Sequence, residues 1–146
     1  DNLHARAGST DVHELHGNIE RSRCLGCGAL FHGDEAPPSE TNPRCDCGGR
    51  IRPDVVWFGE SLPEQELRFA QEAAQDCDLY LAIGTSGLVY PAAALPMIAR
   101  QAGAYVVEIN PEPSAIARQL DECLAGPSGS VLPLLLETAR RLRGTA

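Results

Sequence analysis

Two closely spaced pairs of cysteines constrain this chain more than any other feature of its sequence. Cys24 and Cys27 frame the tetrapeptide CLGC, and Cys45 and Cys47 frame CDC. The surrounding segment has few aliphatic residues and many glycines and prolines, so it cannot bury a core of its own without a cross-link. Four thiolates with no open position are typical of a structural zinc site. The pattern therefore predicts a zinc-dependent module over residues 19–54.

The cysteines leave some alternatives open. The single-residue spacer of the second pair is tighter than the usual spacing of about two to four residues, so His32 is a candidate substitute ligand. A redox pair and unligated buried thiols are the competing interpretations. Cys77 and Cys123 stand in apolar or helical surroundings, where we expect buried thiols without a chemical role.

Composition and charge narrow the class of protein. A chain of 146 residues that is 43% hydrophobic can bury one core. The net charge is −8 and every one of the 12 basic residues is an arginine, which disfavours binding to nucleic acid. No run approaches the roughly 18 apolar residues of a membrane span, and no basic and apolar leader opens the sequence. We therefore expect a cytoplasmic protein without membrane attachment.

Downstream of the cysteines, strand-like and helix-like segments alternate. Apolar runs of β-forming residues occupy 55–58, 79–83 and 105–109. Apolar residues at helical spacing occupy 63–75, 92–101 and 131–142, and weakly 11–15. This alternation predicts an α/β fold with a doubly wound parallel sheet. Ligands of such sheets bind at the carboxyl ends of the strands, which places residues 84–86 and 110–112 near any cofactor.

Five motifs in this order resemble those of the sirtuins. They are DNLHARAGS followed by VHELHG over residues 1–17, the cysteine pairs, RPDVVWFGE at 52–60, GTSGLVYPA at 84–92, and INPE at 109–112. The resemblance covers essentially the whole chain. It implies an incomplete Rossmann-like sheet with an inserted zinc ribbon. The parts would be a catalytic loop with part of the NAD site (1–18), the zinc module (19–54) and the C-terminal part of the Rossmann-like domain (55–146).

The resemblance also assigns roles in catalysis and NAD binding. In sirtuins the oxygen of an acyl-lysine attacks the ribose carbon of NAD as nicotinamide leaves, and a histidine then helps a ribose hydroxyl to attack the product. His16 matches that general base, and a neutral imidazole suits the task near pH 7. The positions that match NAD-binding residues are Asp1, Gly84, Thr85, Ser86, Asn110, Pro111, Glu112 and Ser128. We expect the other histidines to have ordinary structural roles.

A third set of matches concerns the substrate. Sirtuins clamp an extended peptide between two edges, where backbone pairing gives affinity without sequence preference. The matching positions are Val56, Trp57, Phe58, Gly59, Glu60 and Val89. Val56 would accept a hydrogen bond from the substrate amide, while Phe58 and Val89 would line the lysine channel. A plain core strand explains Val56 equally well.

The implied function is NAD-dependent removal of acyl groups from lysine in peptides or proteins, with release of nicotinamide and O-acyl-ADP-ribose. An inactive zinc-binding and nucleotide-binding interaction module and a sirtuin-type ADP-ribosyltransferase are the alternatives. The choice between acetyl and succinyl or malonyl groups stays open. The sequence opens inside a motif and lacks the family's N-terminal phosphate-binding segment. We therefore expect the isolated chain to bind NAD poorly and to catalyse little.

Overall fold

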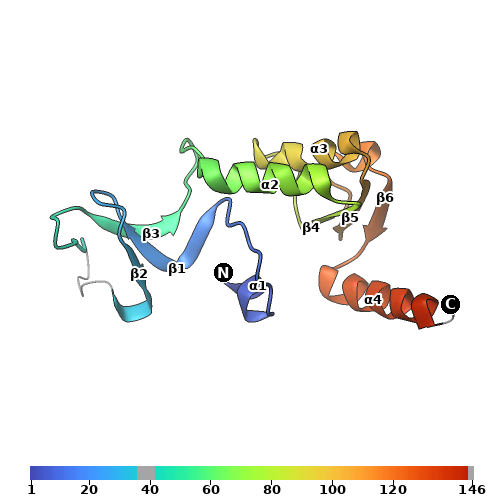
Figure 1. Cartoon of the computed structure of the whole chain (residues 1–146), viewed down its shortest axis with the longest axis horizontal. Coiled ribbons are helices and arrows are strands. Elements are labelled where there is room, and N and C mark those ends of the chain that lie inside the picture. Colours follow the sequence, from blue (N-terminus) through green and yellow to red (C-terminus); the bar gives the residue numbers. More distant parts are fainter. Residues whose placement is uncertain (36–41, 145–146) are drawn as a thin grey trace. The chain divides into compact units, whose positions relative to one another are not determined.

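The computed structural model describes residues 1–35 and 42–144. These residues form two compact units, Asp1–Leu67 and Arg68–Ala146, with the boundary inside one helix (Figure 1). Residues 36–41, which belong to the expected zinc module, lie outside the described range.

The first unit is built around a small antiparallel sheet. Its elements are α1 (Leu3–Arg6), β1 (Gly17–Cys24), β2 (Leu30–His32), the 3-10 helix η1 (Gly33–Glu35) and β3 (Ile51–Val55). The strand order is β2-β1-β3, and the β1–β3 pairing runs from Gly17 opposite Val55 to Cys24 opposite Ile51. Cys24 and Ile51 are both buried. The sheet therefore brings the first cysteine pair next to the loop that carries the second.

The second unit contains a parallel sheet with the order β4-β5-β6. Its strands are β4 (Leu79–Ile83), β5 (Tyr105–Asn110) and β6 (Glu122–Ala125). Its other elements are the 3-10 helices η2 (Ala92–Ala94) and η3 (Ala117–Gln119) and the helices α3 (Leu95–Ala102) and α4 (Ser128–Gly144), while α2 (Glu64–Asp76) crosses the unit boundary. The expected α/β fold with a parallel sheet is confirmed.

Local sequence explains where these elements begin and end. Pro96 lies in the first turn of α3, where its missing N–H costs nothing, and Gly103 ends the helix with a φ of 105°. Val106, Val107 and Ile109 of β5 are buried, as expected for the central strand of a parallel sheet.

Two of the expected segments differ from the structure, and one strand of the parallel sheet was not expected. The helix expected at 11–15 is wrong, because those residues form a loop and the short helix α1 lies before them. The strand expected at 55–58 is also wrong, because β3 ends at Val55 and residues 56–60 form a loop. Strand β6 was not expected, since it is short and begins with the polar Glu122.

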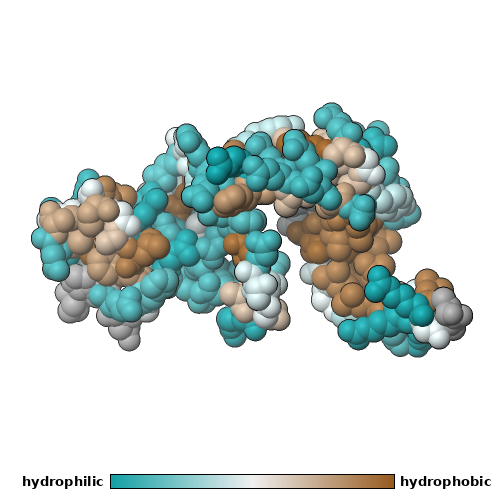
Figure 2. Space-filling model, viewed as in Figure 1, coloured by the Kyte–Doolittle hydropathy of each residue, from teal (hydrophilic) through white to brown (hydrophobic). Residues whose placement is uncertain are grey.

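Apolar side chains of the second unit are also found on its surface. Leu79 and Ile83 of β4 and Leu134, Leu135 and Leu136 of α4 are exposed. Figure 2 shows hydrophobic residues, in brown, over this sheet and on α4. None of the helices within residues 1–35 and 42–144 has the length and hydrophobicity that a membrane crossing requires.

Candidate functional site

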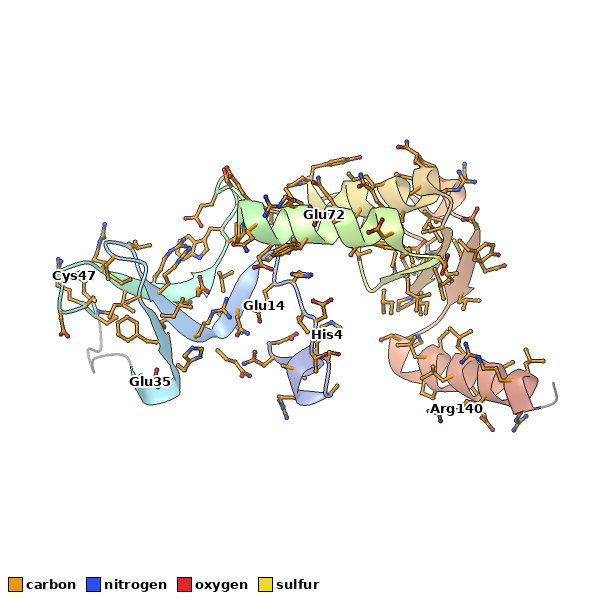
Figure 3. All side chains as sticks on the ribbon, in the orientation of Figure 1. His4, Glu14, Glu35, Cys47, Glu72 and Arg140 are labelled. Carbon is orange, nitrogen blue, oxygen red and sulfur yellow. The ribbon has the colours of Figure 1, made fainter. Side chains whose placement is uncertain are left out.

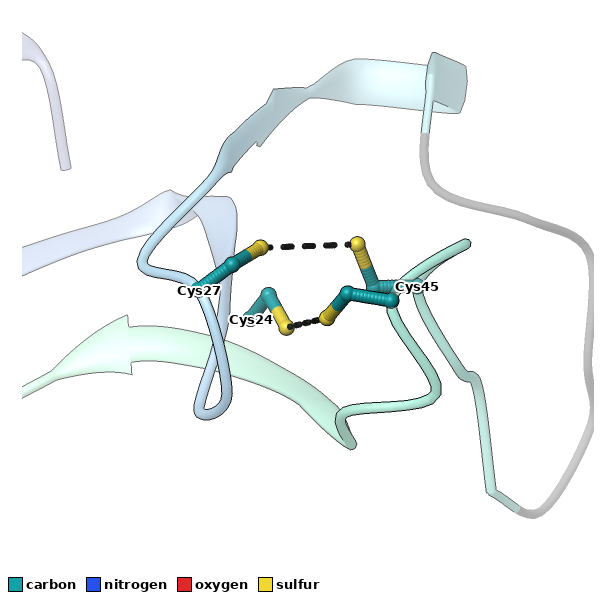
Figure 4. Close-up of side chains that lie close together, drawn as sticks. Cys24, Cys27 and Cys45 are labelled. Carbon is teal, nitrogen blue, oxygen red and sulfur yellow. Dashed lines mark hydrogen bonds between the residues drawn. The ribbon is translucent and has the colours of Figure 1, made fainter.

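The four clustered cysteines converge on one point in the first unit (Figure 4). Their sulfur atoms all lie within 4.8 Å of one another. Cys24 Sγ is 3.5 Å from Cys47 Sγ, and Cys27 Sγ is 3.7 Å from Cys45 Sγ. Four sulfurs bound tetrahedrally at ~2.3 Å from a zinc ion are ~3.8 Å apart, so these separations fit such an ion. The donor set is compatible with a structural zinc site.

Backbone amides point at two of the sulfurs. The N–H of Gly26 donates to Cys24 Sγ at 3.3 Å, and the N–H of Gly49 donates to Cys47 Sγ at 3.4 Å. The two turns pack so closely that a Cβ on Gly49 would lie 2.6 Å from Cys24 Sγ and 2.9 Å from the nitrogen of Gly26. Glycine is therefore required at position 49 for the two turns to meet.

The amides also favour ionisation of one thiol. Hydrogen bonding from the backbone N–H of Cys27, followed by that of Gly26, lowers the pKa of Cys24 to about 6 although the burial of this residue opposes the shift. The N–H of Gly49 favours the thiolate of Cys47, but the neighbouring sulfurs of Cys24 and Cys27 outweigh it and raise the pKa of Cys47. A cation is needed before all four groups can be thiolates together.

His32 is not a member of this cluster. It lies on β2 opposite Arg21 of β1, and the metal-ligand group found among the described residues consists of the four cysteines alone. The one-residue spacer of the second pair is accommodated by a tight turn, in which Cys45 and Gly49 pair through their backbones. The substitute ligand considered from the sequence is therefore not needed.

His16 is exposed and ends the loop that leads into β1. Its carbonyl oxygen accepts a hydrogen bond of 3.0 Å from the N–H of Val56. Gly17 follows with a φ of 76°, and a Cβ there would lie 2.0 Å from the carbonyl oxygen of Asp54. His16 is thus held between the start of β1 and the end of β3.

A network of charged and polar side chains braces the same loop. Glu14, labelled in Figure 3, accepts hydrogen bonds from Arg21 Nη1 and from Asn18 Nδ2. Arg21 Nε donates to Asp54 Oδ2 at 2.6 Å, and Arg23 Nε lies 3.2 Å from Asp54 Oδ1. Burial alone would lower the pKa of Arg21, but its hydrogen bonds to Asp54 and Glu14 raise it.

These bracing residues were not expected from the sequence, and the one signal for them is the alternation of two arginines in a single segment. Arg21 and Arg23 alternate with smaller residues along the segment RSRC, so their side chains share one face of a strand. Asn18 is only 3% exposed, and burial of that amide requires the partners described above.

Residues 57–60, which follow β3, form a turn that exposes the side chains of Trp57 and Phe58. Glu60 accepts two hydrogen bonds from Arg52 Nη2, at 2.8 and 2.7 Å, and a third from the N–H of Trp57 at 3.0 Å. The hydrogen bond from Arg52 is the main reason that the pKa of Glu60 is lowered. Arg52 also stands over the Trp57 ring at 5.2 Å from its centroid. Phe58 is 97% exposed, so this turn presents an apolar side chain rather than burying it.

In the second unit, the turns that follow β4 and β5 lie next to each other. The N–H of Gly84 donates to the carbonyl of Ile109, and Asn110 Nδ2 donates to the carbonyl of Thr85 at 2.8 Å. The N–H of Ala115 bonds to the carbonyl of Ser86. Two motifs 25 residues apart in the chain therefore share one edge of the sheet.

The other positions that the sequence predicts for NAD or substrate binding are mostly exposed. Pro111 and Glu112 are exposed, and Ser128 begins α4 just after Gly126, whose N–H donates to the carbonyl of Asn110. Val89 is 46% exposed. In the first unit, Asp1 accepts a hydrogen bond from the N–H of Leu3.

Comparison with known proteins agrees with this arrangement. Residues 1–91 match the model of the Sir2 family. The NAD-dependent protein deacylase 2 of Pyrobaculum aerophilum is 54% identical over 142 residues, which are 97% of this chain and 57% of the relative. The chain therefore spans little more than half the length of that relative.

Solved structures show the same fold. A Sir2 homologue mutant in complex with ADP-ribose has a TM-score of 0.92 and 39% identity, covering 100% of this chain and 59% of the other. A Sir2 protein bound to a myristoylated histone peptide has a TM-score of 0.83 and 39% identity, with coverage of 100% and 64%.

Proposed function

Because this chain belongs to the Sir2 family, we propose that it carries out NAD-dependent removal of acyl groups from lysine side chains of peptides or proteins. The observation that best supports this proposal is the hydrogen bond between His16 and Val56. It joins the segment that would hold the general base to the segment that would hold the substrate backbone.

We assign NAD to the edge formed by the turns after β4 and β5. Gly84 has a φ of 64°, and no atom lies within 4 Å of the position that a Cβ would occupy. That open space lets a phosphate or sugar approach the backbone closely. Ser86 and Glu112 are exposed at the same two turns and offer hydrogen bonds to sugar oxygens.

NAD, when bound, would supply the ribose carbon to which the acyl oxygen becomes attached. His16 would take a proton from a ribose hydroxyl, a role that suits a neutral imidazole in an exposed position. Val56 would receive the substrate amide at its carbonyl, since its own N–H is already used by His16. Phe58 would contact the apolar part of the acyl-lysine.

The four cysteines would hold zinc as a structural ion, because all four ligand positions of a tetrahedron are filled by sulfur. The ion would stabilise the end of β1 and the start of β3, at the opposite end of this strand pair from His16, without taking part in the chemistry. We further propose that the protein acts in the cytoplasm.

Incubation of the full-length protein with NAD and acetyl-, succinyl- or malonyl-lysine peptides tests the proposal. We expect free lysine peptide, nicotinamide and O-acyl-ADP-ribose, detected by mass spectrometry, and the best acyl group identifies the preference. The variant His16→Tyr should lose turnover while keeping its zinc, and His32→Ala serves as the matched control. Transfer of ADP-ribose to protein instead would favour the ADP-ribosyltransferase. Equal turnover in the His16→Tyr variant would refute the role of His16.

A further inference from the structure

We infer that Glu108 is a positioning residue that fixes the side-chain amide of Asn110, so that its oxygen faces outward to accept a hydrogen bond from a hydroxyl of a bound sugar. This inference rests on the proposed NAD function. It adds a residue that would touch no ligand, and it states which kind of ligand group the end of β5 accepts.

Glu108 is a charged residue in the centre of the parallel sheet. It lies on the middle strand β5 and is 1% exposed. A buried carboxylate is costly unless donors surround it. Its Oε1 accepts hydrogen bonds from Asn110 Nδ2 at 2.6 Å and from the N–H of Ser114 at 2.9 Å, and Cys123 Sγ lies 3.6 Å from Oε2.

These donors are all neutral, and within residues 1–35 and 42–144 no arginine forms an ion pair with Glu108. Burial raises the pKa of Glu108, but the hydrogen bonds from Asn110 and Ser114 outweigh it and lower the pKa overall. The group is therefore an ionised acceptor that cannot donate. Any side chain that bonds to it must present a hydrogen.

Asn110 meets a second acceptor as well. Its Nδ2 donates to the carbonyl oxygen of Thr85 at 2.8 Å in addition to Glu108 Oε1. An amide nitrogen has two hydrogens, so both are used. The opposite orientation would set Oδ1 against a carboxylate and a carbonyl, with no hydrogen between them. The amide can therefore adopt only one orientation, and Oδ1 is left as an acceptor.

The orientation has a chemical consequence for recognition. An outward acceptor selects ligand groups that donate, such as the hydroxyls of a ribose, over groups that only accept, such as phosphate oxygens. A methionine at 108 would remove the carboxylate acceptor, so only the carbonyl oxygen of Thr85 would still orient the amide of Asn110. Glu108 thus acts on the ligand through Asn110.

The test compares binding of two probes, ADP-ribose and its analogue without the hydroxyls of the adenosine ribose, by isothermal titration calorimetry. We expect the unaltered full-length protein to bind ADP-ribose about three- to tenfold more tightly than the analogue, the value of one hydrogen bond. Glu108→Met removes the carboxylate acceptor of Asn110 and should lose most of that ratio. Glu122→Met removes an exposed carboxylate from the neighbouring strand and should keep the ratio. A hypoxanthine analogue of ADP-ribose, which lacks the adenine amine, should bind the unaltered protein as tightly as ADP-ribose does.

Further variants distinguish a failure of this inference from a failure of the proposed function. Asn110→Ala should lower the ratio as much as Glu108→Met, and the double variant should lower it no further. Asn110→Asp should bind ADP-ribose more weakly than Asn110→Ala, because its carboxylate would face Glu108, and this variant keeps the native residue at 108. An unchanged ratio in a folded Glu108→Met variant would refute the inference alone. Failure of the unaltered full-length protein to bind ADP-ribose would instead refute the proposed function.

Discussion

The N–H of Val56 donates a hydrogen bond of 3.0 Å to the carbonyl oxygen of His16. The bond ties the loop before β1 to the turn after β3, so a displacement of either segment moves the other. A misplacement of about 1 Å at a reacting group can cost about 100-fold in rate. The substitution Val56→Pro removes the donor, and we expect kcat to fall by at least about tenfold. Val56→Ala keeps the N–H and should change kcat by less than about threefold, as steady-state kinetics would show.

Gly17→Ala should destabilise the first unit. Its Cβ would lie 2.0 Å from the carbonyl oxygen of Asp54, and the backbone φ of 76° adds strain for any other residue. We expect a loss of more than about 2 kcal/mol in the free energy of unfolding. Gly8→Ala is the control, because Gly8 also has a positive φ but no atom within 4 Å of the added Cβ. It should lose only about 1 kcal/mol in the same urea titration. Equal losses would mean that the contact with Asp54 has no effect.

Arg21→Met should weaken both stability and turnover. The guanidinium joins Glu14 to Asp54, and Asp54 is 8% exposed, so the variant leaves a nearly buried carboxylate with only Arg23 beside it. Removing one partner of such a pair costs about 3 kcal/mol. Arg68→Met removes an exposed arginine 3.8 Å from Glu72 and should cost less than about 0.5 kcal/mol. Thermal and urea unfolding of both variants would measure the difference.

Removal of the metal should unfold the first unit selectively. The purified protein should contain about one equivalent of zinc, and a chelator should abolish the protection of β1 and β3 in hydrogen exchange while β5 keeps its protection. Cys24→Ser should lose the metal. Cys77→Ser should keep it, because Cys77 Sγ bonds to the carbonyl of Ala74 and does not belong to the cluster of four sulfurs. Less than half an equivalent of zinc in the unaltered protein, with four reactive thiols, would contradict the assignment.

Acid should destabilise the protein in part through Glu108. In the folded protein the pKa of Glu108 is lowered below its ordinary value of about 4.5. The contribution of the ionised carboxylate to stability is therefore present above about pH 4.5 and is lost as the pH falls through the folded pKa. Glu108→Gln should therefore be less stable than the unaltered protein at about pH 6, and the difference should shrink at about pH 3.5. Urea midpoints at the two pH values measure this, with Glu122→Gln as the control. A difference that grows in acid would mean that Glu108 is protonated when folded.

The α/β layer could be predicted from the sequence because its strands are apolar and its helices are periodic. Residues 79–83 form β4 with the predicted bounds, and β5 extends the predicted 105–109 by one residue. The antiparallel strands β1 and β2 could not be predicted in this way. Most of their residues are not buried, and their order depends on pairing and on the cysteine cluster rather than on a hydrophobic face. Long-range constraints of this kind leave no periodic pattern.

The candidate site was likewise predicted only in part. The cysteine spacing and the turns after β4 and β5 indicate where polar groups gather. The sequence did not indicate Glu108, although it is the one acidic residue in the apolar run YVVEIN, and a charge inside a predicted core strand is itself a signal. The thiol of Cys123 was expected to be buried, but the residue is exposed, and its sulfur lies near Glu108 because a β6 that was not expected lies beside β5.

The close approach of Gly26 and Gly49 has a consequence for metal selectivity. No side chain separates the two turns, so the width of the sulfur cage is set by main-chain atoms in contact. The two backbones cannot come closer together, so a smaller spacing between the sulfurs would have to come from the cysteine side chains. The contact between the two backbones therefore limits how closely the four sulfurs can surround an ion, and changing that limit would require changes in both glycine turns.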